Sequence, residues 1–288
     1  MVQKHTHKNE LPPIPKPFGL PFYYATLFNI EVAFLVDYEK VEKYLKGTGL
    51  IAAKFKDEAK KEKSKDKAIV SFNFQNYTGQ FPNGASTTQE IELNIVSYPE
   101  SQKETVAFVS AKEYLRGEEQ TKLMGHKRVW VPCDADMAIE AGKKLFGEPK
   151  FKTTFDINLP SLNAPGQNTW MVTCNGPVDP KKPDSKPTVI FTCKADVANL
   201  IPEMSAFSPI TEYGKYGEEL IGCRWNILQP TSLYFLSSNE AKRVQMTYGD
   251  STHEMKKDME QLIGDTPAFA VRTSMSAPAA IQTRAYYI

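Results

Sequence analysis

The stretch Asp136-Met-Ala-Ile-Glu-Ala-Gly-Lys-Lys-Leu-Phe-Gly-Glu-Pro-Lys150 decides how this chain is interpreted. Its apolar residues recur at helical spacing, with Asp136 as a candidate N-cap, and they predict a short helix. Gly147 can end that helix in the left-handed conformation, and Pro149 prevents its continuation. Lys150 is therefore the first residue after a rigid turn. A lysine held in this way can act as a nucleophile if apolar surroundings keep part of it neutral.

The same stretch resembles the active-site signature of the acetoacetate decarboxylase superfamily, in which a helix leads into a Pro-Lys pair. The match runs from Ala138 to Lys150. A weaker resemblance continues at residues 28–45, which are similar to the family's first strand and helix. Residues 243–246 and 278–285 resemble its last strands. The resemblance implies that Lys150 forms a Schiff base with a carbonyl substrate.

The resemblance also implies a set of pocket residues, and this chain departs from it. Glu90 matches one of the family's two pocket glutamates, whereas Asn73 stands where the other is expected. Leu35 stands in place of an arginine of the first strand, and Phe151 in place of a second lysine. We therefore predict that Lys150 and Glu90 are catalytic. Phe151, Leu35 and Asn73 are predicted to contact the substrate, through an uncharged wall that suits an apolar or differently shaped molecule.

Other polar residues compete for these roles. Glu92 shares a strand face with the candidate carboxylate, because side chains alternate along a strand. Lys152 could replace the missing cation, and Glu148 is expected at the surface. His126 and His253 have no partner at the spacing of a triad or a metal site, so both are predicted to be structural. The alternative for the lysine itself is a turn residue exposed to solvent.

Short β-prone segments dominate the rest of the sequence. Residues 68–74 and 87–98 alternate between apolar and polar side chains, which is typical of strands with one buried face. Many such strands and few helices predict an α+β protein that is mostly antiparallel β. The resemblance implies a cone-like β-barrel. We expect residues 1–22, rich in proline, to form an extended arm and residues 23–288 to form one acetoacetate decarboxylase-like domain.

Composition excludes several classes of function. The 288 residues carry a net charge of +1, which does not point to nucleic acid or an anionic membrane. No apolar run approaches the roughly 20 residues that span a bilayer. No glycine-rich phosphate loop or metal-ligand spacing is present, so neither a cofactor nor a metal is expected. The widely spaced cysteines predict buried thiols in a reducing, cytoplasmic compartment: Cys133, Cys174, Cys193 and Cys223.

Three functions remain open on the sequence alone. The first is an acetoacetate decarboxylase-like lyase that acts on a small keto acid through Lys150. The second is another imine reaction, an aldol condensation or a dehydration, on a pyruvate-like substrate. The third is a barrel that binds a small molecule without catalysis. The resemblance further implies a homo-oligomer.

Overall fold

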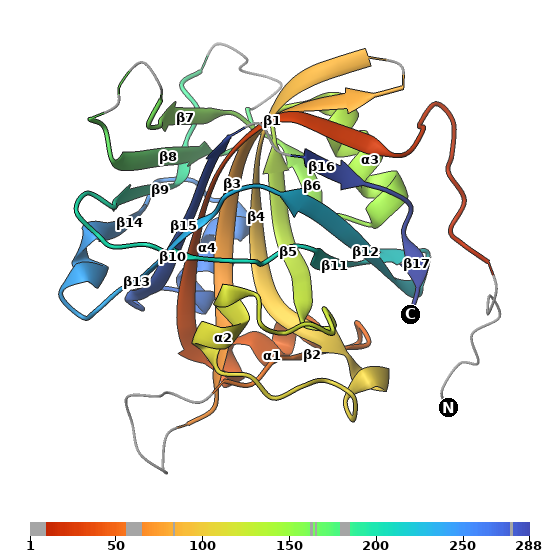
Figure 1. Ribbon diagram of the computed structural model, residues 1–288. Coiled ribbons are helices and arrows are strands. Elements are labelled where there is room, and N and C mark those ends of the chain that lie inside the picture. Colours follow the sequence, from red (N-terminus) through yellow and green to blue (C-terminus); the bar gives the residue numbers. More distant parts are fainter. Residues whose placement is uncertain are drawn as a thin grey trace.

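The computed structural model describes residues 10–55, 65–82, 84–161, 164, 166–178, 185–276 and 279–288. Strands dominate these residues, with a few short helices at their edges, as Figure 1 shows. This composition confirms the predicted strand-rich class. The helices are α1 (Glu39–Leu45), η1 (Glu100–Gln102), α2 (Ala111–Arg116), α3 (Asp136–Phe146), η2 (Glu240–Arg243) and α4 (Glu254–Leu262).

Thirteen strands form one large sheet in the order β10-β13-β15-β1-β16-β12-β11-β5-β4-β2, with β3, β6 and β17 paired beside this path. The order does not return to its first strand, so the predicted closed barrel is not confirmed. The sheet nevertheless curls strongly along its long strands (Figure 1). Its strands are β1 (Phe22–Asp37), β2 (Leu50–Ala52), β3 (Lys67–Phe81), β4 (Gly84–Pro99), β5 (Gly125–Cys133), β6 (Lys150–Lys152), β10 (Glu203–Met204), β11 (Ile210–Tyr216), β12 (Glu219–Leu228), β13 (Ser232–Phe235), β15 (Ala268–Ser276), β16 (Ala279–Gln282) and β17 (Tyr286–Tyr287).

A second sheet of four antiparallel strands packs against the first. Phe72 meets Phe191 with ring centroids 5.5 Å apart, and Phe74 meets Phe155 at 5.9 Å. Helix α4 adds Met259 and neighbouring apolar side chains to this core. The apolar face that alternation predicts in β3 and β4 is therefore the face that the second sheet covers. Its strands are β7 (Phe155–Asn158), β8 (Thr169–Asn175), β9 (Val189–Asp196) and β14 (Val244–Tyr248).

The opposite face of β1, β3 and β4 carries buried polar side chains. Glu31, Asn73, Gln75, Glu90 and Glu92 all lie there with little solvent exposure. Because side chains alternate along a strand, one apolar face packs against the second sheet while the other encloses these polar groups. Buried polar groups need partners, so this face is where binding or catalysis is expected.

The turn that delivers Lys150 forms as predicted, with one difference at its start. Helix α3 begins at Asp136 itself, and Ala135 is the N-cap, without a side-chain hydrogen bond. Gly147 ends the helix with φ of 63°, the left-handed conformation expected there. A Cβ at Gly147 would lie 2.0 Å from the carbonyl oxygen of Lys215 in β11. The turn is therefore pressed against the sheet and needs glycine at this position.

The part of the proline-rich arm that is described, residues 10–21, lies along the body of the protein. Arg284 donates hydrogen bonds to the carbonyl oxygens of Pro12 and Leu11, at 2.6 and 3.0 Å. Phe18 and Leu20 pack against an apolar cluster that includes Phe146. Residues 1–9 and Pro278, part of the resemblance above, lie outside the described residues.

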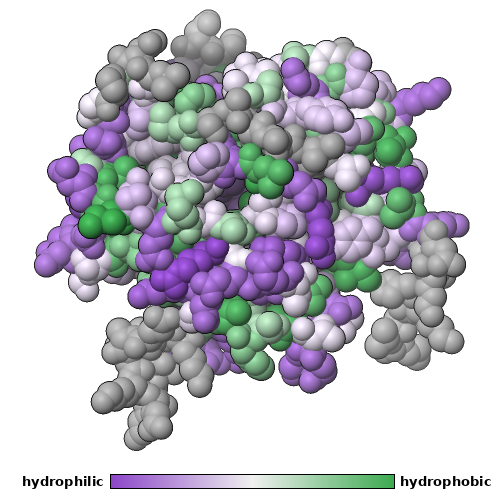
Figure 2. Space-filling view, in the orientation of Figure 1, coloured by the Kyte–Doolittle hydropathy of each residue, from purple (hydrophilic) through white to green (hydrophobic). Residues whose placement is uncertain are grey.

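The surface and the thiols agree with the composition. Figure 2 shows hydrophilic residues over most of one face, with hydrophobic ones in small separate groups. The four cysteine side chains are buried, as predicted. None of the helices in the described ranges has the length and hydropathy that crossing a membrane requires.

Candidate active site

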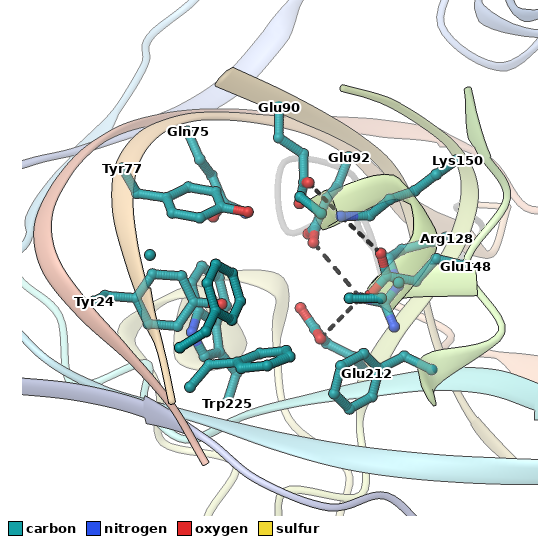
Figure 3. A pocket seen from close by; sticks show the side chains of 17 residues that line it. Tyr24, Gln75, Tyr77, Glu90, Glu92, Arg128, Glu148, Lys150, Glu212 and Trp225 are labelled. Atoms are coloured by element: carbon teal, nitrogen blue, oxygen red, sulfur yellow. Dashed lines mark hydrogen bonds and ion pairs between the residues drawn. The ribbon is translucent and has the colours of Figure 1, made fainter. Parts of the chain in front are cut away.

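A cavity opens on the polar face of the large sheet, between β1, β3, β4, β5 and helix α3. Its volume is about 490 Å³, counting its open mouth, and 17 residues line it. Charged groups gather on one side and aromatic rings on the other (Figure 3). Lys150 and Glu90, the two predicted catalytic residues, both line it.

Lys150 lies at the centre of the charged side. It is the first residue of β6 and is only 7% exposed. Its ammonium group donates a hydrogen bond to the Glu90 carboxylate and lies 3.0 Å from Oε2 of Glu148. The strand pairing between β5 and β6 places it beside Val131, so the backbone fixes where the side chain starts. A buried amine with two carboxylate neighbours is the central feature of the site.

Arg128 holds the surrounding carboxylates together. Its Nη1 lies 2.9 Å from Oε1 of Glu148, 2.8 Å from Oε2 of Glu212 and 3.6 Å from Oε1 of Glu92. All of these side chains are buried. Glu148 thus bridges Arg128 and Lys150. The network joins β4, β5, β6 and β11 across the large sheet.

Burial and charge set the protonation of this network. Burial raises the pKa of Glu90 to about 7, against the attraction of Lys150. Burial alone would lower the pKa of Lys150, but the Glu148 and Glu90 carboxylates outweigh it and hold the pKa well above its usual range. The expectation of a neutral amine, activated by apolar surroundings, is therefore wrong for the free protein. Lys150 rests as an ammonium and needs a proton acceptor before it can attack a carbonyl.

The aromatic side of the cavity faces this network. Tyr24 meets Tyr77 with ring centroids 5.0 Å apart and Trp225 at 5.6 Å. Gln75 lies beside Tyr77 on β3 (Figure 3). Within the described residues, neither Nε2 of Gln75 nor Nε1 of Trp225 has a hydrogen-bond acceptor. Both groups are donors that a substrate oxygen could satisfy.

The three predicted substrate-contacting residues do not line this cavity. Phe151 stacks on His253, with centroids 4.3 Å apart, and meets the edge of Trp130. Leu35 packs in the apolar cluster under helix α2. Asn73 accepts a hydrogen bond from Asn29 and lines a different cavity. The predicted uncharged wall beside Lys150 is therefore not formed by these residues.

Strand register explains the position of Asn73, and the length of β1 explains that of Leu35. Gln75, not Asn73, lies directly opposite Glu90 in the β3–β4 pairing, whereas Asn73 lies opposite Glu92. A shift of two residues keeps a side chain on the same face, so alternation alone could not detect the error. Tyr24, near the start of β1, lines the cavity, whereas Leu35 lies near the other end of this 16-residue strand.

The structure also shows where the competing polar residues Glu92, Lys152 and Glu148 lie. Glu92 lines the cavity with Glu90, so both carboxylates face it. Lys152 is exposed, with its amine 2.9 Å from Asp136, and it does not replace the missing cation. Glu148 is buried in the network, so the prediction of a surface residue is wrong. The turn at Gly147 sends the chain inward, where the Glu148 amide donates to the carbonyl of Gly142.

His126 and His253 do not line the cavity around Lys150. His126 is buried on β5, and His253 caps helix α4 by accepting a hydrogen bond from the Met255 amide. Within the described residues, no group of three or more His, Cys, Asp or Glu side chains is arranged to hold a metal ion.

Gly142 makes room for the side chains of Glu148 and Lys150. A Cβ at this position of α3 would lie 2.4 Å from Oε2 of Glu148 and 2.6 Å from Cε of Lys150. Both contacts are with flexible side-chain ends, so we expect Gly142→Ala to fold while displacing the amine. A displacement near 1 Å can cost about 100-fold in rate. The imine formation that the sequence predicts for Lys150, measured by borohydride trapping, should slow by that order in this variant. Lys143→Ala, the exposed neighbour, should not change the rate.

Comparison with known proteins relates this arrangement to a set of solved structures. No protein-family model and no curated protein sequence matches the chain. The enduracididine biosynthesis enzyme MppR, complexed with the condensation product of pyruvate and imidazole 4-carboxaldehyde, is similar at a TM-score of 0.60 and 9% identity, over 96% of this chain and 90% of that one.

Two further solved structures are similar to this chain over nearly the same range. An acetoacetate decarboxylase-like enzyme from Sphingomonas wittichii RW1 is similar at a TM-score of 0.57 and 10% identity, over 93% and 92% of the two chains. An acetoacetate decarboxylase is similar at 0.56 and 12% identity, over 96% and 95%. The likeness covers nearly the whole of each chain. At this level of identity it concerns the fold, and the chain has the fold of the acetoacetate decarboxylase-like enzymes.

Proposed function

We propose that this protein is an imine-forming lyase that acts on a small keto acid through Lys150. The observation that carries the proposal is the buried Lys150 amine at a cavity wall, hydrogen-bonded to a carboxylate whose pKa is raised to about 7. Burial makes Glu90 a stronger base than an ordinary carboxylate, and it is already in contact with the proton it must accept. The fold, shared with acetoacetate decarboxylase-like enzymes, supports the same proposal.

The proposed reaction begins with proton transfer from Lys150 to Glu90. The neutral amine then attacks the substrate carbonyl carbon, a C–N bond forms, and a proton moves from nitrogen to oxygen to give a carbinolamine. Glu90 returns its proton to the hydroxyl group, the C–O bond breaks, and water leaves an iminium ion. Gln75 and Trp225, whose N–H groups have no acceptor among the described residues, supply hydrogen bonds to the substrate's oxygens. The iminium ion accepts the electrons released when a neighbouring bond breaks.

The carboxylates of the cavity favour an aldol or dehydration reaction over decarboxylation. Among the described residues, four carboxyl groups line the cavity, those of Glu90, Glu92, Glu148 and Glu212, and only two cationic groups, those of Lys150 and Arg128. Removal of a C–H proton and loss of a hydroxyl group need positioned acids and bases, whereas loss of carbon dioxide from an iminium ion needs neither. We therefore propose a pyruvate-like ketone as the substrate that forms the enamine.

Hydrogen exchange at pyruvate tests this choice. In D₂O, the methyl protons of pyruvate should exchange with solvent in the presence of the protein, because an enamine at Lys150 loses and regains them. Proton NMR measures the loss of the methyl signal, and Lys150→Ala should abolish it. Rapid release of carbon dioxide from acetoacetate, without pyruvate exchange, would return the assignment to decarboxylation. If the protein catalyses neither reaction but binds the keto acid tightly, it is a binding protein.

The assembly is a separate proposal. We expect a homo-oligomer, as the resemblance implies, and light scattering of the purified protein measures its mass directly.

A further inference from the structure

A second cavity adjoins the first along Trp225, whose side chain lines both. Its volume is about 800 Å³, counting its open mouth. Neither Lys150 nor Glu90 lines it. The proposed reaction therefore leaves this cavity without a role.

Its polar end contains a buried ion pair that is only partly satisfied. Arg272 on β15 lies directly opposite Glu31 on β1, and its Nη2 donates to the Glu31 carboxylate. Both residues are buried, and the guanidinium carbon lies 3.5 Å from the ring centroid of Phe207. Among the described residues, nothing accepts a hydrogen bond from Nη1 of Arg272. A buried guanidinium thus keeps one terminal nitrogen without a partner.

His126 adds a second unsatisfied group beside the same ring. Its ring centroid lies 5.9 Å from that of Phe207, and neither of its nitrogens has a partner within the described part of the chain. Burial, helped by the neighbouring Arg128, lowers the pKa of His126 to about 3, so the ring is neutral and carries one N–H. Arg272 and His126 both contact Phe207 and both line the cavity, so each brings one donor to its wall.

The rest of the cavity wall combines apolar side chains with amide and hydroxyl groups, among them Asn29, Asn73 and Gln229. Leu27, Ile210 and Ile227 line it together with Trp225, and Leu228 lies exposed at its edge. The apolar members of this wall can contact the body of a ligand whose polar group reaches Arg272. Buried donors without acceptors are costly, and a carboxylate is the acceptor that guanidinium groups bind best.

We propose that this cavity is a second binding site, specific for a small carboxylate with an apolar body. The carboxylate accepts hydrogen bonds from Arg272 and His126, and the apolar body packs against Ile227 and Trp225. The ligand needs no carbonyl group, which distinguishes it from the substrate of Lys150.

Benzoate is a suitable probe, because it has an apolar ring and cannot form an imine. Calorimetry should show that benzoate binds. Benzamide, its neutral analogue, should bind at least about tenfold more weakly. Lys150→Ala should bind benzoate as the wild type does, which places the ligand outside the first cavity. Benzoate should also change the tryptophan emission, and Trp225→Phe should remove that change.

Two variants of the ion pair decide the role of Arg272. Glu31→Gln removes the competing carboxylate and should tighten benzoate binding by about tenfold, because the ligand becomes the counter-ion. The double variant Glu31→Gln with Arg272→Gln keeps the pair neutral and should lose benzoate binding while remaining folded, as circular dichroism would verify. Equal affinity for benzamide, unchanged or weaker binding in Glu31→Gln, or no binding to the wild type would each overturn the proposal.

Discussion

Replacement of Arg128 by methionine is expected to destabilise the protein by about 3–5 kcal/mol, the cost of removing one partner from a buried ion pair. Arg128 lies within 3.6 Å of Glu92, Glu148 and Glu212, and methionine can fill its space without supplying charge. The carboxylates would then be buried without their main counter-ion. Urea unfolding at neutral pH measures the loss.

The pH dependence and a rescue variant separate this cause from simple loss of packing. Protonation neutralises carboxylates, so the destabilisation of Arg128→Met should shrink as the pH falls. Adding Glu212→Gln should restore part of the stability at neutral pH. Arg224→Met, at an exposed position of β12, serves as the control and should change stability by less than about 0.5 kcal/mol. A comparable small effect for Arg128→Met would contradict the network described above.

Replacement of Glu90 by glutamine is expected to slow imine formation at Lys150 by about 100-fold or more, the usual contribution of a general base. Glutamine keeps the size of the side chain but cannot accept a proton from the ammonium. The wild-type rate should also fall as the pH drops through about 7, because Glu90 is then protonated. This inflection should be absent in Glu90→Gln.

Single-turnover trapping with pyruvate and borohydride, followed over pH, measures both effects. Glu140→Gln, an exposed carboxylate of α3, is the matched control and should keep the wild-type profile. If Glu90→Gln retains the rate and the inflection, Glu90 is not the base. Glu148, at 3.0 Å from the amine, would then take its place.

The sequence predicted the parts of the site that depend on local rules. The helix, the left-handed Gly147 and the turn before Lys150 follow from residues within one short segment, and all three form. Alternation also predicted that Glu90 and Glu92 share a face, and both line the cavity.

The parts that failed depend on contacts far along the chain. Arg128 and Glu212 are 84 residues apart in the sequence, and their ion pair requires the parallel contact of β5 with β11. No local pattern marks that contact. Phe151 follows Lys150 directly, yet alternation within β6 turns its ring to the other side of the strand, toward His253. The state of Lys150 was missed for the same reason, since it is set by carboxylates rather than by its chain neighbour.

Polar positions within β5 were the signal that could have been used. His126 and Arg128 lie two residues apart in an otherwise strand-like segment, so they share one face and both are buried. Charged residues are rarely buried without a partner. A strand with arginine on one face and the glutamates of the neighbouring β4 therefore indicates a buried charge network, although it does not identify the partner from β11.

The most direct test of the central claim is to locate the imine. The protein is incubated with pyruvate or acetoacetate, reduced with borohydride and digested, and the modified peptide is identified by mass spectrometry. A single reduced adduct on Lys150 is expected. Lys150→Ala should lack it, and Lys152→Ala, at the exposed lysine of the same strand, should retain it. Adducts scattered over exposed lysines and unchanged in Lys150→Ala would contradict the assignment of Lys150 as the nucleophile.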